Sequence, residues 1–300
     1  MNDFALQVLL PLITFAALGC LRASGDRSLL APGATPQKLA ESFQFTEGPA
    51  PDREGNVYFT DQPNDRILKW SIDGTLTTFL QPSGRSNGMY FDRLGNLISC
   101  ADEQNQLWSI SPDGQHTVLV SEFNQKLLNG PNDVWVRDDG AMYFTDPLYK
   151  RDYWQRGPME QDGEHVYFLS ADRKILKRVE EDLIKPNGIV GTADNKTLYV
   201  ADIRGKKTYA YQINQDGTLT NRKVFCDMGS DGMTIDSEGN IYLTGQGVTV
   251  FDSQGNKIQN IPIAEDWTAN VCFGGRERDT LFITASPSLY SVKMRVQGVK

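Results

Sequence analysis

Six polar residues recur along this chain, and each opens a short apolar segment that runs into a turn. Two are carboxylates and four are carboxamides, so every one offers a side-chain oxygen. Oxygen-only ligand sets select hard cations, and Ca²⁺ accepts carboxylate, amide carbonyl and water in a flexible coordination shell. Two negative charges would balance one divalent ion. The six residues are Glu47, Asn87, Asn132, Asn187, Asp231 and Asn270.

A simpler interpretation exists for each of these residues taken alone. Asn-Gly and Asp-Gly pairs commonly form turns, and a single pair is better explained in that way. The shared register favours a metal site, because six independent turn residues could equally be Ser, Gly, Pro or Lys. We therefore predict that the six side chains meet at one cation.

The elements that must position these residues form a repeat. The six residues are 39 to 55 positions apart, a spacing typical of propeller blades or solenoid units. After each one, a tight turn leads to a returning strand. The predicted returning strands are residues 55–61, 95–102, 140–146, 196–202, 239–245 and 280–286.

Third and fourth strands follow most returning strands, so the pattern predicts an all-β, six-bladed β-propeller of four-stranded antiparallel blades. The sixth blade lacks a fourth strand of its own. Residues 37–45, ahead of the first blade, form a free strand that can fill this place. We therefore expect an N-terminal strand to close the ring and residues 37–300 to form one domain. In a propeller, the first strand of every blade lines the central channel, which places the six polar residues at one mouth.

The composition of the chain limits the functions that it can have. The chain has 300 residues and a net charge of -8, which argues against binding to nucleic acid, because that requires a basic surface. Cys100, Cys226 and Cys272 lie in three different blades without close spacing, so we expect no essential disulfide and no structural zinc site. The sequence specifies no oligomeric state.

The N-terminus predicts export. Residues 4–18 form an apolar run of the length of a signal-peptide core, too short to span a bilayer comfortably. Ala17-Leu18-Gly19-Cys20 resembles the cleavage and acylation box of bacterial lipoproteins. We expect residues 1–22 to be a signal, residues 23–36 a flexible tether, and the protein to be periplasmic or secreted, with a lipid anchor at Cys20 as an alternative.

Several motifs together resemble the SMP-30/gluconolactonase family, in order and at comparable spacing over about residues 37–296. This resemblance implies a six-bladed propeller that holds a divalent cation, often calcium, and that hydrolyses sugar lactones. The motifs are Phe45-Thr46-Glu47-Gly48-Pro49, Pro131-Asn132-Asp133, Tyr143-Phe144-Thr145-Asp146-Pro147, Lys185-Pro186-Asn187-Gly188 and Ser230-Asp231-Gly232-Met233.

The resemblance also implies roles for single residues. Glu47, Asn187 and Asp231 match the family's metal ligands, and Asn132 matches an asparagine that binds metal or substrate. The expected cation is Ca²⁺, with Zn²⁺, Mn²⁺ or Mg²⁺ as alternatives. Some animal members carry an arginine two positions before that asparagine, where this chain has Gly130, so their substrate contacts do not transfer.

The chemistry expected of such a site is ester hydrolysis. A cation stabilises the oxyanion that forms when water attacks a lactone carbonyl. Asp231 is the first candidate for the base that receives the water's proton, and hydroxide formed without a distinct base is the alternative.

A long insertion, residues 147–164, interrupts the third blade near the expected mouth. It carries aromatic and basic side chains suited to sugar carbons and to hydroxyls or a carboxylate, although a surface flap is an equally good interpretation. The predicted substrate-binding residues are Asn87, Asn132, Tyr149, Trp154, His165 and Asn270.

Other carboxylates are predicted to have structural roles. Asp133 should alternate away from Asn132 along its strand and bond backbone groups. The aspartates at the ends of returning strands are expected to form turns. These aspartates are Asp61, Asp102, Asp146 and Asp202.

Two other functions fit the same sequence. One is a phosphotriesterase on a similar propeller, which a panel of lactones and organophosphates would separate from a lactonase. The other is a non-catalytic propeller that binds partners and holds a structural metal.

Overall fold

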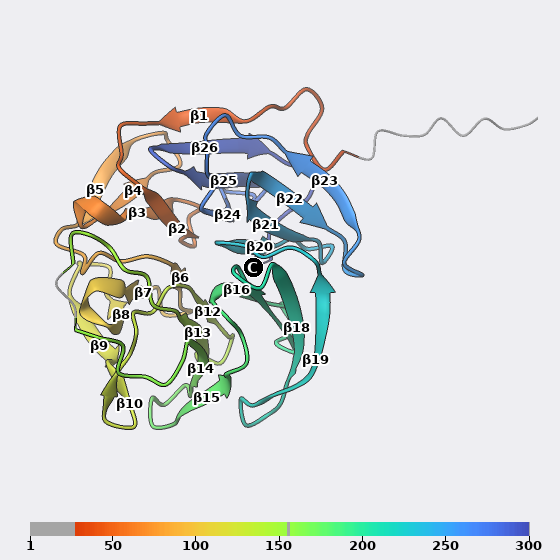
Figure 1. Ribbon diagram of the computed structural model, residues 1–300. Helices are drawn as coiled ribbons and strands as arrows, with labels where there is room; N and C mark the ends of the chain where they lie inside the picture. The colour runs from red at the N-terminus through yellow and green to blue at the C-terminus, as the bar shows by residue number, and fades with distance from the viewer. Residues whose placement is uncertain (1–27, 155–156, 300) are drawn as a thin grey trace, which may run out of the picture.

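Six small antiparallel sheets surround a central channel in the computed structural model, which describes residues 28–154 and 157–299 (Figure 1). Each sheet has four strands, and the first strand of each lies nearest the axis. The predicted six-bladed propeller is confirmed. The predicted signal segment, residues 1–22, and Cys20 lie outside the described residues. Within the described part of the chain, no helix has the length and apolar character needed to cross a membrane.

The first three blades follow the chain in order. Blade one consists of β2 (Thr46–Pro51), β3 (Val57–Asp61), β4 (Arg66–Trp70) and β5 (Leu76–Leu80). Blade two consists of β6 (Met89–Phe91), β7 (Leu97–Ala101), β8 (Gln106–Ile110) and β9 (His116–Val120). Blade three consists of β12 (Val134–Val136), β13 (Met142–Asp146), β14 (His165–Leu169) and β15 (Leu176–Glu180).

The last three blades complete the ring. Blade four consists of β16 (Pro186–Gly191), β17 (Thr197–Asp202), β18 (Lys207–Ile213) and β19 (Leu219–Cys226). Blade five consists of β20 (Met233–Ile235), β21 (Ile241–Gly245), β22 (Gly247–Phe251) and β23 (Lys257–Ile261). Blade six consists of β24 (Asn270–Gly274), β25 (Thr280–Ala285), β26 (Ser288–Lys293) and β1 (Gln37–Ala40).

Minor elements were not predicted. A hairpin of β10 (Glu122–Phe123) and β11 (Lys126–Leu127) precedes blade three. Two short 3-10 helices, η1 (Gln62–Asn64) and η2 (Asp102–Gln104), connect the second and third strands of blades one and two. Each ends on a residue in the left-handed region, which turns the chain back into the next strand.

The N-terminal strand closes the ring as predicted. β1 pairs antiparallel with β26 and becomes the outermost strand of blade six (Figure 1). The chain ahead of it differs from the expected flexible tether. Leu30 forms a bridge with Met294, and Leu29 and Leu30 pack against the apolar cluster of blades five and six. Burial of these leucines fixes a segment whose composition alone indicates a linker.

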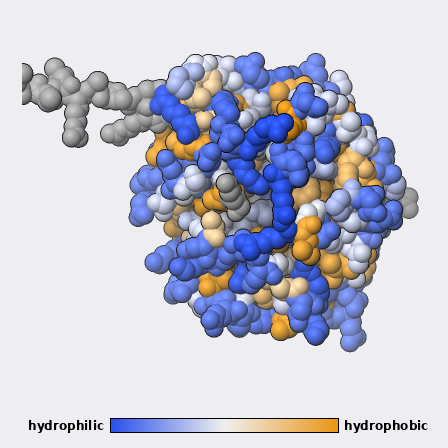
Figure 2. Space-filling view, turned by 180° about the vertical axis from the view of Figure 1, so that it is seen from behind, coloured by the Kyte–Doolittle hydropathy of each residue, from blue (hydrophilic) through white to orange (hydrophobic). Residues whose placement is uncertain are grey.

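The apolar core lies between neighbouring blades rather than in one centre. Every residue of β3, β7, β13 and β21 is buried, because the second strand of a blade is covered by sheets on both faces. Cys100, Cys226 and Cys272 are buried free thiols of this core. On the face seen in Figure 2, opposite to the one in Figure 1, hydrophobic residues are scattered among hydrophilic ones.

Candidate active site at the channel mouth

The polar entries to the first strands are β-bulges, which explains how they aim side chains at the axis. In blade three, Thr145 exchanges backbone hydrogen bonds with both Asn132 and Asp133, so two residues face one. In blade two, Cys100 bonds Asn87 and Gly88 in the same way. A bulge interrupts the alternation of side chains and re-aims them. The extra residue is therefore the cause of this change in side-chain direction.

The glycines that follow the leading residues allow neighbouring blades to pack closely against each other. A Cβ atom on Gly48 would lie 2.1 Å from the carbonyl oxygen of Asn87, and one on Gly232 would lie 1.9 Å from Cγ of Asn270. Both distances are far below any real contact. The entry of one blade therefore rests directly on the entry of the next, which draws the six leading residues toward a single mouth.

Buried aspartates fix three of these entries. Each of these aspartates accepts hydrogen bonds from two consecutive backbone N–H groups. The two groups belong to the residues three and two positions before the leading residue of the same blade. The aspartates are Asp61, Asp146 and Asp202. For Asp202, the acceptor distances are 2.9 Å to the nitrogen of Ile184 and 3.0 Å to that of Lys185. Sequence analysis predicted turns at these positions, and Asp202 does accept a hydrogen bond at 2.8 Å from Gly205 in the turn that follows it. The three aspartates also tie the end of the second strand to the start of the first strand of the same blade.

Asn187 and Asp231 meet at the mouth although they come from blades four and five. Asn187 Nδ2 donates hydrogen bonds to Asp231 Oδ1 at 2.8 Å and to the hydroxyl oxygen of Tyr149 at 2.7 Å. Trp267 Nε1 donates to Asp231 Oδ2 at 2.6 Å. Asn187 is buried, whereas Asp231 keeps partial exposure toward the mouth. Both oxygens of Asp231 are thus held by donors from neighbouring blades.

Glu47 of blade one joins this group and is 2 % exposed. Burial raises the pKa of Glu47 well above its ordinary value, and the nearby charges of Asp231 and Asp133 raise it further. Burial also raises the pKa of Asp231, while the hydrogen bonds from Trp267 and Asn187 oppose that rise. Three carboxyl groups therefore lie near one another in a poorly hydrated space.

The residues present fit a divalent cation. Asn187 Oδ1 is buried and has no hydrogen-bond partner among the described residues, as expected for an oxygen that meets a metal ion. A cation between Glu47 and Asp231 would offset the burial and repulsion that raise their pKa values. Among residues 28–154 and 157–299, no group of three or more His, Cys, Asp or Glu side chains is placed to hold a metal ion by itself. The donor set therefore depends on amide oxygens as well as carboxylates.

The remaining asparagines of the predicted ring lie at the same level. Asn87, Asn132 and Asn270 are all buried. Asn270 hydrogen-bonds the carboxyl groups of Glu47 and Asp133, which lowers their pKa values against the larger effect of burial. The side-chain amides of Asn87 and Asn132 form no hydrogen bond with another described residue, which leaves them available to a ligand.

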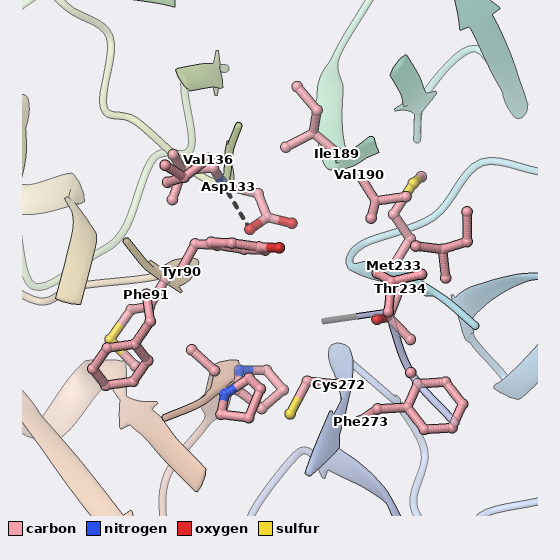
Figure 3. Close-up of a pocket in the computed structure, with 18 of the residues that line it drawn as sticks. Tyr90, Phe91, Asp133, Val136, Ile189, Val190, Met233, Thr234, Cys272 and Phe273 are labelled. Atoms are coloured by element: carbon pink, nitrogen blue, oxygen red, sulfur yellow. Dashed lines mark hydrogen bonds between the residues drawn. The ribbon is translucent and has the colours of Figure 1, made fainter. Parts of the chain in front are cut away.

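Asp133 differs from its prediction in one respect. It accepts a hydrogen bond from the N–H of Val134 at 3.0 Å, as expected for a carboxylate that bonds backbone. Its carboxylate nevertheless projects into the channel beside the ring of Tyr90 (Figure 3). The bulge at Asn132 and Asp133 turns both side chains toward the axis, which the strict alternation of a strand does not allow. Burial raises the pKa of Asp133 to about 8.

Beneath Asp133 and Asn270 the channel widens into a cavity of about 330 Å³. Its walls are largely apolar and come from the first strands of the blades (Figure 3). The far end carries arginines and the C-terminal residues Gly298 and Val299. Asp133 and Asn270 thus separate this cavity from the mouth that holds Asn187 and Asp231.

The insertion at residues 147–164, here called the mouth loop, extends from blade four to blade two. Its described residues are 147–154 and 157–164. The ammonium group of Lys185 in blade four lies 4.6 Å from the centre of the Tyr149 ring. The hydroxyl of Tyr149 accepts a hydrogen bond from Asn187. Tyr153 lies 4.6 Å from the guanidinium group of Arg85, which precedes blade two. The loop therefore forms a wall of the mouth.

Two substrate-binding predictions in this loop have different outcomes. Tyr149 lies within the site, whereas Trp154 is buried and reaches it only through Arg151, whose guanidinium lies 5.7 Å from the Trp154 ring. Burial raises the pKa of Tyr149, so its hydroxyl stays protonated. Since this hydroxyl accepts from Asn187, its own hydrogen is free to donate to a ligand.

His165 does not belong to the site. It opens β14 inside blade three, where its Nε2 lies 3.1 Å from Asp162 Oδ1 and its ring packs against Gly163. Asp162 in turn forms an ion pair with Arg178 at 2.8 Å. Strand register decides this outcome, because His165 pairs with Asp146 in β13 and the return of the mouth loop covers it.

Two residues that the predicted site set does not contain lie at the mouth. Trp267 opens blade six three positions before Asn270, and this place was its signal. Arg151 lies among the aromatic and basic residues of the mouth loop, which the sequence marked only as a group. Its positive charge lowers the pKa of Asp231, as the hydrogen bonds from Trp267 and Asn187 do, against the larger effect of burial.

Comparison with known proteins finds relatives that match most of this chain. The family model for the SMP-30/Gluconolactonase/LRE-like region matches residues 45–287. The chain is 29% identical over 290 residues to a gluconolactonase of Zymomonas mobilis, covering 87% of this chain and 81% of that protein.

Solved structures resemble it as well. A gluconolactonase of Xanthomonas campestris superimposes with a TM-score of 0.83 at 31% identity, covering 89% of this chain and 91% of the other. A calcium-binding protein, regucalcin, of Agrobacterium tumefaciens shares the fold with a TM-score of 0.73 at 19% identity, covering 87% of this chain and 94% of the other.

Proposed function

Because this chain belongs to the SMP-30/gluconolactonase/LRE-like family, we propose that it is a lactonase that opens sugar lactones at the channel mouth. Relatives named gluconolactonase and pentonolactonase support the reaction and the substrate class. The proposal depends on one observation: Glu47, Asn187 and Asp231 come from three different blades and meet at the mouth. Among the described residues, the amide oxygen Oδ1 of Asn187 has no hydrogen-bond partner there.

Glu47, Asn187 and Asp231 would hold a divalent cation, with Asn132 beside them. Ca²⁺ is the expected ion because all donors are oxygens, and a related protein is named as calcium-binding. When bound, the cation polarises the lactone carbonyl and stabilises the charge that develops on its oxygen.

The chain's own residues orient the substrate and move one proton. Tyr149 donates a hydrogen bond to a ring substituent, and Asn132 and Asn87 offer amide groups to hydroxyls. Asp231 receives a proton from the attacking water as the new carbon–oxygen bond forms. The ester bond of the ring breaks, and the same proton returns to the ring oxygen, so the product is a hydroxy acid.

Proton release from glucono-1,5-lactone tests this function. We expect wild-type protein to open the lactone and Asp231→Asn to lower kcat/KM by about a hundredfold or more, the usual contribution of a general base. Asp194→Asn, which changes an exposed turn aspartate, is the matched control and should keep wild-type activity.

Cation binding is measured separately by titration calorimetry on chelated protein. Glu47→Gln should weaken Ca²⁺ binding, while Asp194→Asn should not. A wild-type protein that binds Ca²⁺ but opens no lactone would support the non-catalytic alternative and overturn the proposed function.

A further inference from the structure

Arg151 stands out at the mouth because its charge has no partner. The Arg151 side chain forms no ion pair or hydrogen bond with another described residue, and its Nε is buried without an acceptor. Two other basic side chains nearby are engaged: Lys185 pairs with Glu164 at 3.0 Å, and Arg85 pairs with Glu103 at 3.2 Å. A partly buried guanidinium without an acceptor is costly unless a ligand supplies one.

Aromatic rings fix the position of Arg151. Its guanidinium lies 5.1 Å from the ring of Tyr149 and 5.7 Å from the ring of Trp154. Tyr149 bonds Asn187, and Asn187 bonds Asp231, so the guanidinium is connected to the reaction centre through one continuous set of contacts. Stacking on rings orients a guanidinium without using its N–H donors, which remain free for a planar anion.

The charges of the mouth favour an anionic ligand. A divalent cation would balance the carboxylates of Glu47 and Asp231. Arg151 adds a positive charge beside the substrate position, and its buried Nε has no acceptor among the described residues. A neutral sugar lactone would leave this charge unpaired, whereas a monoanionic one would neutralise it.

We propose that Arg151 is the specificity-determining residue of this site and that the preferred substrates are sugar lactones bearing an anionic group, a carboxylate or a phosphate. This inference rests on the proposed lactonase function. Arg151 binds the anion through its free N–H groups, while Tyr149 and Asn187 connect it to the carbon that reacts.

Two matched substrate pairs separate the anions. Glucaro-1,4-lactone and glucono-1,4-lactone differ only by a carboxylate in place of a hydroxymethyl group. 6-Phosphoglucono-1,5-lactone and glucono-1,5-lactone differ only by a phosphate. For Arg151→Gln, we expect kcat/KM to fall about ten- to a hundredfold more for the anionic member of the preferred pair, the usual effect of losing a charge-assisted hydrogen bond.

Two further variants are controls for this experiment. Arg151→Lys keeps the charge but loses the planar fork, so it should restore part of the preference. Lys150→Gln removes one exposed charge from the same loop and should leave the preference unchanged. Thermal unfolding of each variant shows whether the fold is intact.

A binding measurement avoids dependence on catalysis. D-glucuronate and D-glucose 6-phosphate, each against D-glucose, keep the pyranose ring without a lactone bond. Calorimetry on chelated and Ca²⁺-loaded protein should show tighter binding of one anion, lost in Arg151→Gln. Equal losses for neutral and anionic ligands would overturn the role of Arg151 while leaving the lactonase function in place. A wild-type protein that opens no lactone would instead remove the function itself.

Discussion

At the residue scale, Asn187 connects the parts of the site. Its Nδ2 reaches both the carboxylate of Asp231 and the hydroxyl of Tyr149, and its Oδ1 remains without a partner among the described residues. One side chain thus links the metal-binding face of the mouth to the loop that covers it. Because the amide is buried, each of its contacts is made away from competing water.

Trp267 gives a prediction for the same scale. Its hydrogen bond to Asp231 at 2.6 Å favours the ionised carboxylate, so Trp267→Phe should raise the pKa of Asp231. Since Asp231 must be ionised to accept a proton, the acid limb of the kcat/KM profile should move to higher pH. At acidic pH, we expect kcat/KM to fall by about tenfold or more, the size of a lost hydrogen bond to a charged group.

The control for this prediction is Trp108→Phe, which removes an indole N–H that donates to Gln106 in blade two. Its pH profile should match that of wild type. An unchanged acid limb in Trp267→Phe would show that the ionisation of Asp231 does not govern the reaction.

At the scale of the element, one arrangement recurs: the entry to the bulged first strand of a blade is hydrogen-bonded to a buried aspartate at the end of the second strand. Asp61, Asp146 and Asp202 supply it in blades one, three and four. Blades five and six have Gly245 and Ala285 at this position, and in blade five the hydroxyl of Ser230 bonds Thr244 instead. Blade two also lacks this aspartate and has Ala101 at the position. Blades five and six supply Asp231 and Asn270, so other contacts fix these entries.

The variant Asp202→Asn tests whether this aspartate fixes the entry to the first strand. An amide offers one acceptor oxygen in place of two, so the N–H of Ile184 or of Lys185 is left facing a donor. We expect a loss of about 1–3 kcal/mol in the free energy of unfolding. Asn187 follows this segment by two residues, so Ca²⁺ affinity should also fall.

Denaturant unfolding and calcium titration measure the two effects on the same protein. Asp194→Asn, in an exposed turn of the same blade, should change the free energy of unfolding by less than about 0.5 kcal/mol. Unaltered calcium affinity in a destabilised Asp202→Asn would mean that the aspartate stabilises the blade without positioning Asn187.

At the scale of the whole molecule, closure of the ring brings ionisable groups together that the chain keeps apart. Glu47, Asp133 and Asp231 belong to blades one, three and five, yet the charges of Asp133 and Asp231 raise the pKa of Glu47, and that of Asp231 raises the pKa of Asp133. The pairing of β1 with β26 completes the sixth blade. Folding therefore creates a concentration of negative charge that a cation relieves.

Stability should depend on pH accordingly. The pKa of Asp133 rises from 3.8 to about 8 on folding, so the folded state binds its proton more tightly than the unfolded chain does. This contribution to stability is complete below about pH 4 and is lost as the pH rises through about 8. In chelated protein, the melting temperature should fall by several degrees between these values, since 1 kcal/mol corresponds to roughly 2–4 °C in a domain of about this size.

Differential scanning calorimetry of chelated and Ca²⁺-loaded protein checks this dependence. Ca²⁺ should reduce the fall, because it balances the same carboxylates. Asp133→Asn cannot ionise and should flatten the slope in chelated protein. An equal slope in that variant would show that another group is responsible.

The sequence by itself determined the architecture and the identity of most site residues. A repeated turn and returning strand, such as Tyr143 to Asp146, fixes the blade, because hydrophobic alternation and turn residues act over a few positions. The leading residues could be named for the same reason, since each occupies the same place in its own repeat. Once six repeats imply a ring, their convergence follows.

Only the tertiary structure decided which neighbours each side chain meets. The bulge that turns Asp133 toward the axis, the enclosure of His165 within blade three and the stacking of Arg151 on Tyr149 depend on contacts between segments far apart in the chain. A local pattern carries no information about such contacts. Register within a strand is set by the blade that it joins, and the path of the mouth loop is set by the blades on which it rests.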